Sequence, residues 1–270
     1  MKPVTLCLAI VTCVCNRFKD NLSTCCDIIS TAARKGADMV IFPEMTLTGY
    51  GTDDRFSKQV PPIDSHLIQT FARLSDQLNI GILIGLAEKI NERMYGSHLA
   101  FIPHTPYGKY QKLHIAPNEQ SFFTPGTQIP VFDYDKVRFG IQLCYDAHFP
   151  ELSTAMALQG ADLIVLPHAS PRGTQEDKFA SWMRHLPARA FDNGVFVTAV
   201  NQTGDNGAGL EFPGLSVVIG PDGKLISRSL PEKNHLHFVT LDPKQLDHVR
   251  SHRMRYFLPH RRKDLFPVIG

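Results

Sequence analysis

Residues 36–43 read GADMVIFP, and residues 160–167 read GADLIVLP. The two octapeptides are identical at four positions, and each of the other four pairs joins two apolar residues. A short apolar run that is closed by proline is typical of a strand buried on both faces of a sheet. The chain therefore contains two copies of one buried strand.

The segments in front of the two copies are also alike. Before the first copy, residues 4–15 form an apolar run, and residues 21–35 place apolar side chains at helical spacing up to Gly36, which can cap a helix. Before the second copy, residues 137–143 read as a strand and residues 151–159 as a helix. This pattern indicates a weak internal duplication. It predicts an α/β protein in which two sheets or half-sheets pack together with helices outside.

The rest of the chain completes this architecture. We expect a helix at 63–78, strands at 80–88, 97–103, 195–200 and 215–219, and a turn at 221–223 that leads into a strand at 224–227. No linker or low-complexity stretch divides the chain, so residues 1–270 are predicted to form a single domain.

Charge and hydropathy exclude several classes of function. The chain carries 28 Lys and Arg against 26 Asp and Glu, so its formal charge of +2 gives no electrostatic reason to propose a nucleic-acid or membrane partner. No apolar run approaches the roughly 20 residues that span a bilayer. The N-terminal apolar run lacks a small-residue cleavage site, and Arg17 and Lys19 follow it, so we expect a buried first strand rather than a signal peptide. A cytoplasmic protein is predicted.

The cysteines and histidines leave a metal or redox protein as one alternative. Five of the six cysteines lie in the expected first strand and the helix after it, which favours a packed, reduced interior over disulfides. No C-x-x-C pair occurs, and Cys13 and Cys15 are expected to share one face of the strand as core residues. His235 and His237 have no third ligand in view, which favours solvated side chains. No metal and no cofactor is predicted.

Polar residues that directly follow predicted strands are the first candidates for a site, because ligands of open α/β sheets bind beyond the carboxyl ends of the strands. Glu44, Cys144, His168 and Asn201 hold such positions. Cys144 is followed by Pro150, which can begin a helix, and a strand, elbow and helix expose a nucleophile. Backbone N–H groups and a nearby cation would favour the thiolate. A buried core cysteine is the alternative reading.

A thiol nucleophile also needs a base and a group that stabilises an oxyanion. Glu44 could supply the first and Lys112 the second. By spacing alone, Lys112 could equally be a surface lysine, and Glu44 a loop carboxylate or a helix cap.

The chain resembles the nitrilase-like carbon-nitrogen hydrolases, which are thiol amidases with a Glu-Lys-Cys triad. Three motifs carry the resemblance: FPE at 42–44 with LTGY at 47–50, YQKLH at 110–114 through FTPG at 123–126, and GIQLCYDAHFPE at 140–151. Further similarities are RAFDN at 189–193, Asn201 with Gly204, GLS at 214–216 and RRKDL at 261–265. Each motif is short, but all of them occur in the family's order.

The resemblance implies a mechanism. Glu44 would accept the thiol proton, Cys144 would attack the carbonyl or carbamoyl carbon, and Lys112 with the backbone N–H of Tyr145 would stabilise the oxyanion. A thioester would form and be hydrolysed by water that Glu44 activates. Glu119 matches a second glutamate of the family, which would hold the Lys112 ammonium; a surface residue in a polar loop is its alternative reading.

The resemblance also implies a four-layer α-β-β-α sandwich that assembles as a homodimer or a larger homo-oligomer. A non-catalytic binding protein on this fold is possible in principle, since fold does not imply function, but the complete triad argues against it. The basic residues near the C-terminus are interpreted as an interface or a solvated face; they are Arg250, Arg253, Arg255, Arg261, Arg262 and Lys263.

The substrate is predicted only by class. True nitrilases tend to carry Cys-Trp-Glu at the nucleophile, whereas this chain has Cys144-Tyr145-Asp146, which favours an amidase and leaves a nitrilase as the alternative. Branches that hold a substrate carboxylate often place Arg just after the nucleophile, but Ala147 and His148 stand there. We therefore predict a small linear amide or N-carbamoyl compound. The residues expected to approach it are Tyr50, His148, His168, Arg172 and Glu176; Arg172 could still bind an anion.

Overall fold

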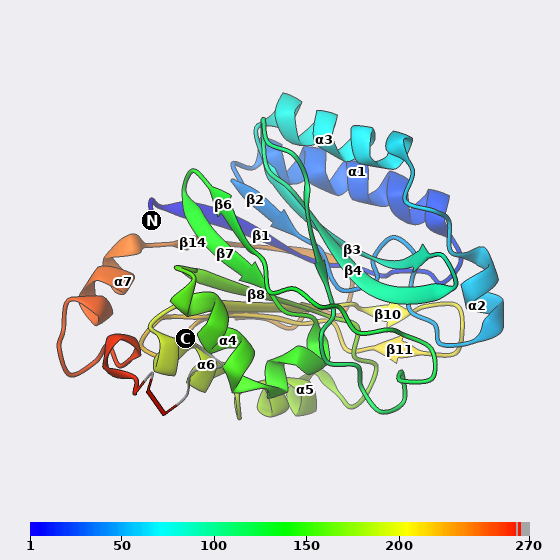
Figure 1. Cartoon of the computed structure of the whole chain (residues 1–270). Helices are drawn as coiled ribbons and strands as arrows, with labels where there is room; N and C mark the ends of the chain where they lie inside the picture. Colours follow the sequence, from blue (N-terminus) through cyan, green and yellow to red (C-terminus); the bar gives the residue numbers. More distant parts are fainter. Residues whose placement is uncertain (263, 266–270) are drawn as a thin grey trace.

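The computed structural model describes residues 1–262, 264 and 265, and it contains two stacked six-stranded sheets (Figure 1). In spatial order, the first sheet consists of β14 (His235–Leu241), β1 (Val4–Ile10), β2 (Met39–Ile41), β3 (Gly81–Ile90), β4 (Arg93–Phe101) and β5 (Gly108–Gln111). The second consists of β13 (Leu225–Ser229), β12 (Ser216–Ile219), β9 (Phe196–Asn201), β8 (Leu163–His168), β7 (Val137–Ile141) and β6 (Val131–Tyr134).

Helices cover the outer face of each sheet (Figure 1). The first sheet is covered by α1 (Phe18–Arg34) and α3 (Ser65–Leu78), and the second by α4 (Pro150–Leu158), α5 (Gln175–Trp182) and α6 (Leu186–Asn193). The predicted four-layer α-β-β-α sandwich is therefore confirmed. Shorter elements join these layers: α2 (Asp54–Gln59), η1 (Cys144–His148), β10 (Gly204–Asp205), β11 (Glu211–Phe212), α7 (Pro243–Arg250) and η2 (Leu258–His260).

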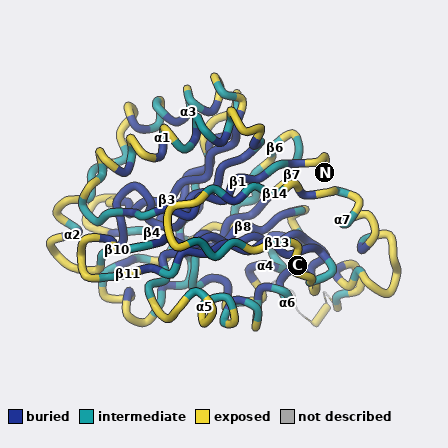
Figure 2. Tube along the Cα trace, turned by 180° about the vertical axis from the view of Figure 1, so that it is seen from behind, coloured by how far each residue is buried: buried dark blue, intermediate teal, exposed yellow. Residues whose placement is uncertain are grey.

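Strand β1 shows how the sequence builds the layers. Successive side chains of a strand point to opposite faces, and from Leu6 to Ile10 both sets of side chains are apolar. Leu6, Leu8 and Ile10 belong to the core between the two sheets, whereas Cys7 and Ala9 belong to the core beneath the outer helices. Figure 2 shows the result: the central strands are buried, and exposure is concentrated on the outer helices and the loops.

The two copies of the duplicated octapeptide occupy equivalent places. β2 pairs in parallel with β1 and β3, and β8 pairs in parallel with β7 and β9. The backbone N–H of Asp38 donates to the carbonyl of Thr5, and that of Asp162 donates to the carbonyl of Arg138. Glu44 and His168 therefore lie at the carboxyl ends of corresponding strands.

Most predicted elements occur within a few residues of the expected bounds, but the first strand is shorter. It ends at Ile10 because the backbone of the next two residues bonds outside the sheet: the carbonyl of Val11 accepts from the N–H of Thr203, and the N–H of Thr12 donates to the Asn234 side chain. Cys13 is buried and Cys15 is half-buried outside the strand. The expectation that these two cysteines share a strand face is therefore wrong.

The prediction that His237 is solvated is wrong, because its side chain is buried. It lies on β14, and its Nδ1 and Nε2 are 2.7 Å and 2.8 Å from the hydroxyl oxygens of Ser216 and Ser227 in the other sheet. Burial and the neighbouring His235 lower its pKa to about 4, so the imidazole that joins the sheets is neutral. His235 itself is exposed.

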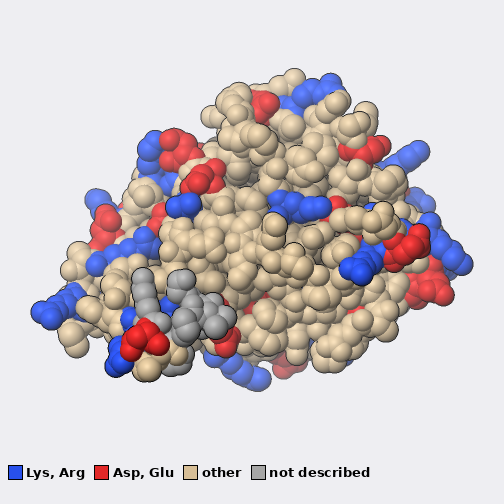
Figure 3. All heavy atoms as spheres, in the orientation of Figure 1, with Lys and Arg blue, Asp and Glu red and all other residues tan. Residues whose placement is uncertain are grey.

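The charged surface has no single sign on the face that Figure 3 shows, where Lys and Arg alternate with Asp and Glu. Near the C-terminus, Arg250 pairs with Asp162 at 2.5 Å and Arg262 pairs with Asp264, while Arg253, Arg255 and Arg262 are exposed. Lys263 lies outside the described residues. Within residues 1–262, 264 and 265, no helix is long and apolar enough to cross a membrane.

Candidate active site

Cys144 lies at a sharp elbow between β7 and α4. It begins the short 3-10 helix η1, and α4 follows with Pro150 as its first residue. The φ angle of Cys144 is +44°, in the left-handed region that residues other than glycine rarely adopt. Such strain is concentrated at functional sites, where the surrounding structure maintains it. The strand, elbow and helix predicted around Cys144 are present.

Asp146 holds this elbow and was not anticipated as a site residue. The side chain is fully buried, and one oxygen accepts hydrogen bonds from the backbone N–H of Leu143 at 2.9 Å and from the Tyr110 hydroxyl at 2.7 Å. The other oxygen accepts from the backbone N–H of His114 at 2.8 Å and lies 2.8 Å from Nδ1 of the same residue. Asp146 thus ties the nucleophile elbow to the segment that carries Lys112.

Replacing Asp146 by asparagine is expected to loosen both segments. One acceptor oxygen becomes an N–H₂ group that faces donors, so we expect the free energy of unfolding to fall by about 1–3 kcal/mol and kcat to fall with it. Denaturant unfolding and steady-state kinetics would measure the two effects. Asp135→Asn is the matched control, because Asp135 is fully exposed and bonds only Lys2 among the described residues. Equal behaviour of the two variants would contradict the positioning role of Asp146.

Lys112 lies between two buried carboxylates. Its Nζ donates to Glu44 Oε1 at 3.0 Å and to Glu119 Oε2 at 2.9 Å, and no more than 5% of any of these three residues is exposed. The Tyr50 hydroxyl donates to the other oxygen of Glu119 at 2.8 Å. Burial alone would lower the pKa of Lys112, but neighbouring groups, among them the carboxylates of Glu44 and Glu119, outweigh it and hold the pKa above its usual value. Lys112 is therefore an ammonium.

Glu44 is fixed on both its backbone and its side chain. Its Oε2 accepts from the backbone N–H of Ala169 at 3.0 Å, and its carbonyl accepts from Gln202 Nε2 at 2.7 Å. Burial raises the pKa of Glu44 to about 7, with Lys112 opposing the shift and Glu119 adding to it. A carboxylate with this pKa is suited to accept and return protons near neutral pH.

The thiol of Cys144 is not preionised, contrary to the expectation from sequence. Burial raises its pKa to about 12; the Glu44 charge adds to the rise, and Lys112 opposes it. Two carboxylates outnumber the one ammonium between them, so the cluster disfavours a further negative charge. With this pKa the thiol is protonated near neutral pH, so an attack by its sulfur would require a base that accepts the proton.

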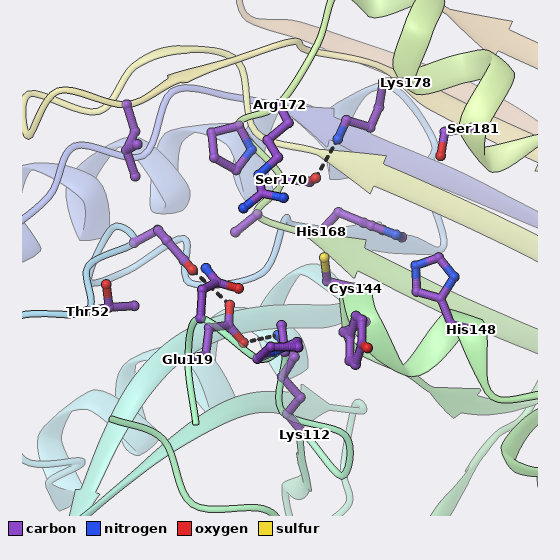
Figure 4. A pocket seen from close by; sticks show the side chains of 18 of the residues that line it. Thr52, Lys112, Glu119, Cys144, His148, His168, Ser170, Arg172, Lys178 and Ser181 are labelled. Carbon is purple, nitrogen blue, oxygen red and sulfur yellow. Dashed lines mark hydrogen bonds and ion pairs between the residues drawn. The ribbon is translucent and has the colours of Figure 1, made fainter. Parts of the chain in front are cut away.

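One cavity of about 690 Å³ brings together the predicted site residues (Figure 4). Its lining includes Tyr50, Lys112, Glu119, Cys144, Tyr145, His148, His168 and Arg172. Glu44 is not in the lining, but it contacts Lys112 and Ala169, which are. Glu176 is exposed and does not line the cavity, so its expected approach to the pocket is wrong; it lies in the first turn of α5, which directs it outward.

Lys178, Trp182 and His185 are among the lining residues that the sequence did not predict. They follow the second octapeptide at α5 and the turn after it, where helical spacing of polar and apolar residues gives no sign of a cavity. The His168 ring packs 4.5 Å from that of Trp182, and its Nδ1 lies 2.8 Å from the Leu166 carbonyl. Burial lowers the pKa of His168 to about 3 and that of His185 to about 4, so both imidazoles are neutral.

A metal site finds no support in the described residues. Among residues 1–262, 264 and 265, no group of three or more His, Cys, Asp or Glu side chains is placed to hold a metal ion. All six cysteines are free thiols.

The sandwich and the cysteine at its strand–helix elbow define a hydrolase of the nitrilase fold. The chain belongs to the carbon-nitrogen hydrolase family, whose model matches residues 7–251. An (R)-stereoselective amidase of Pseudomonas sp. is 30% identical over 243 residues, which cover 90% of this chain and 85% of that protein. A nitrilase of Pyrococcus abyssi is 26% identical over 91% of this chain and 92% of its own length.

A solved structure of an amidase variant from Nesterenkonia sp. is 26% identical, with a TM-score of 0.81 over 98% of this chain and 96% of that one. It shows covalent addition of the acetamide moiety of fluoroacetamide at the active site cysteine. The predicted family, its fold and its hydrolase class are thus confirmed.

Proposed function

We propose that this protein hydrolyses a small linear amide or N-carbamoyl compound through a thioester on Cys144. The observation that carries the proposal is the convergence of a strained cysteine, a carboxyl of pKa about 7 and a buried ammonium around one cavity. The amidase relatives support the same chemistry.

In the first half-reaction, Glu44 accepts the Cys144 proton as sulfur attacks the carbonyl carbon. A lysine ammonium has three N–H donors, and Glu44 and Glu119 take two of those of Lys112, so one is left for the oxyanion. The backbone N–H of Tyr145 is the second proposed donor. Glu44 then protonates the leaving nitrogen, the C–N bond breaks, and ammonia or an amine departs.

In the second half-reaction, Glu44 takes a proton from water, and the hydroxide attacks the thioester carbon. The C–S bond breaks, and sulfur recovers the proton from Glu44. The carboxylic acid leaves and the thiol is restored. Every step uses groups of this chain and water alone.

The experiment combines an ammonia assay with intact-protein mass spectrometry on wild type and Cys144→Ala, after incubation with pooled amides, carbamoyl compounds and nitriles. We expect ammonia release and a mass increase confined to wild type, with the added mass identifying the acyl group. Faster turnover of a nitrile than of the matching amide would instead favour the nitrilase alternative. Ammonia release by both proteins would contradict the thiol mechanism.

Three expectations stay predictions: a single domain over residues 1–270, a homodimer or larger homo-oligomer, and a cytoplasmic location. The proposed hydrolysis of a small molecule does not depend on any of these three predictions.

A further inference from the structure

Two cations line the catalytic cavity without a carboxylate partner. Arg172 lies in the loop after β8, and Lys178 lies on α5. Within the described residues, Arg172 has no hydrogen bond or ion pair, and Lys178 bonds only the Ser170 hydroxyl. Figure 4 shows both side chains beside Ser170, with Cys144 between them and Lys112 in this view.

Arg172 is exposed and Lys178 is half-buried. Two other half-buried cations have carboxylate partners, whereas the buried Arg189 bonds the carbonyls of Ala147 and His148. Lys109 pairs with Glu88 at 2.7 Å, and Arg250 pairs with Asp162 at 2.5 Å. A partly buried ammonium without such a partner is unfavourable, and a second cation beside it adds to the cost. Both effects act on Lys178, since burial and the charge of Arg172 lower its pKa. The arrangement calls for an anion that the protein itself does not supply.

The site is held in place by the sheet. Asn201, at the end of β9, accepts from the backbone N–H of Ser170 at 2.9 Å and donates to its carbonyl at 3.0 Å. This fixes the loop that carries Arg172 and the hydroxyl that Lys178 contacts. The exposed carboxylate of Glu211 lines the same cavity, but it forms no ion pair with either cation in the described part of the chain.

We infer that Arg172 and Lys178 form a subsite for a carboxylate at the far end of the amide or carbamoyl substrate. This inference rests on the proposed function and names its substrate class. An arginine presents paired N–H donors that match the two oxygens of a carboxylate, and a lysine adds a point charge. Arg172 and Lys178 line the same cavity as Cys144, so one small substrate can place its amide at the thiol and its carboxylate at the two cations. The absence of Arg at 147 and 148 does not exclude an acidic substrate, because the loop after β8 and helix α5 supply these two cations.

The test compares amides that differ only at the far end. Succinamate and butyramide share a chain, with a carboxylate in one where the other has a methyl group; 3-aminopropanamide replaces that carboxylate by an ammonium. We expect wild type to prefer succinamate over butyramide in kcat/KM by roughly tenfold or more, and to disfavour the cationic amide. The preference should shrink as salt is added, since the two cations are partly exposed.

Variants assign the preference to the subsite. Arg172→Gln and Lys178→Gln should each lower the succinamate-to-butyramide ratio by roughly tenfold, whereas Arg73→Gln and Lys19→Gln, exposed cations on α3 and α1, should leave it unchanged. Equal turnover of succinamate and butyramide by wild type would overturn the inference and leave the proposed function standing. If wild type hydrolysed neither, the proposed function would fail for these amides. In that case, the affinities of Cys144→Ala for succinamate and for butyramide would still test the inference. It is wrong if succinamate binds no tighter than butyramide.

Discussion

Replacing Cys144 by alanine is expected to reduce amide hydrolysis by at least about 10,000-fold, because removal of a covalent nucleophile leaves only the binding and oxyanion contacts. Ammonia release under saturating substrate would measure the loss. The variant should also accumulate no acyl adduct by mass spectrometry. Residual activity within tenfold of wild type would mean that another group attacks the substrate.

The free energies of unfolding of two Cys144 variants test the strained elbow independently of activity. Cys144 has a φ of +44°, so alanine keeps the strain of a Cβ in the left-handed region while glycine relieves it. We expect Cys144→Gly to be as inactive as Cys144→Ala but to unfold with a free energy about 1 kcal/mol higher than that variant, measured by denaturant titration. If the glycine variant were the less stable of the two, the elbow would not be strained as described.

The sequence predicted the parts of the fold that depend on local pattern. The octapeptides at 36–43 and 160–167 identified the two central strands and, through them, Glu44 and His168 at the strand ends. The elbow at Cys144 followed from a strand and a helix-starting proline on either side. The pairing of β14 with β1 was not predicted, because more than two hundred residues separate the two strands and no turn joins them.

The sequence also did not predict properties that depend on which groups the fold brings together in space. A cation near Cys144 suggested a thiolate, but the fold buries the thiol itself and places two carboxylates with one ammonium beside it, so its pKa rises instead. Likewise, the sequence places Asp146 in a motif but does not show its bonds to the distant His114 backbone and Tyr110 hydroxyl. Lys178 lines the cavity because α5 packs on the second sheet, and the sequence does not show this packing.

Replacing Glu44 by glutamine is expected to lower kcat/KM by roughly 100-fold to 10,000-fold and to change its pH dependence. The base must be deprotonated to accept the thiol proton, and burial raises the pKa of Glu44 to about 7. In wild type, kcat/KM should therefore rise with pH up to about 7 and level off above it. The thiol pKa of about 12 keeps Cys144 from titrating in that range. In Glu44→Gln, the rise near pH 7 should vanish.

Glu119→Gln is the matched control, because Glu119 bonds the same Lys112 ammonium. Its negative charge raises the pKa of Glu44, so its removal should slow the reaction yet keep the rise of kcat/KM and move the midpoint to lower pH. The two variants thus distinguish a carboxylate that transfers protons, Glu44, from a carboxylate that only holds the Lys112 ammonium, Glu119. If Glu44→Gln retained the rise near pH 7 and Glu119→Gln lost it, the base would be Glu119, and the assignment of Glu44 would be wrong.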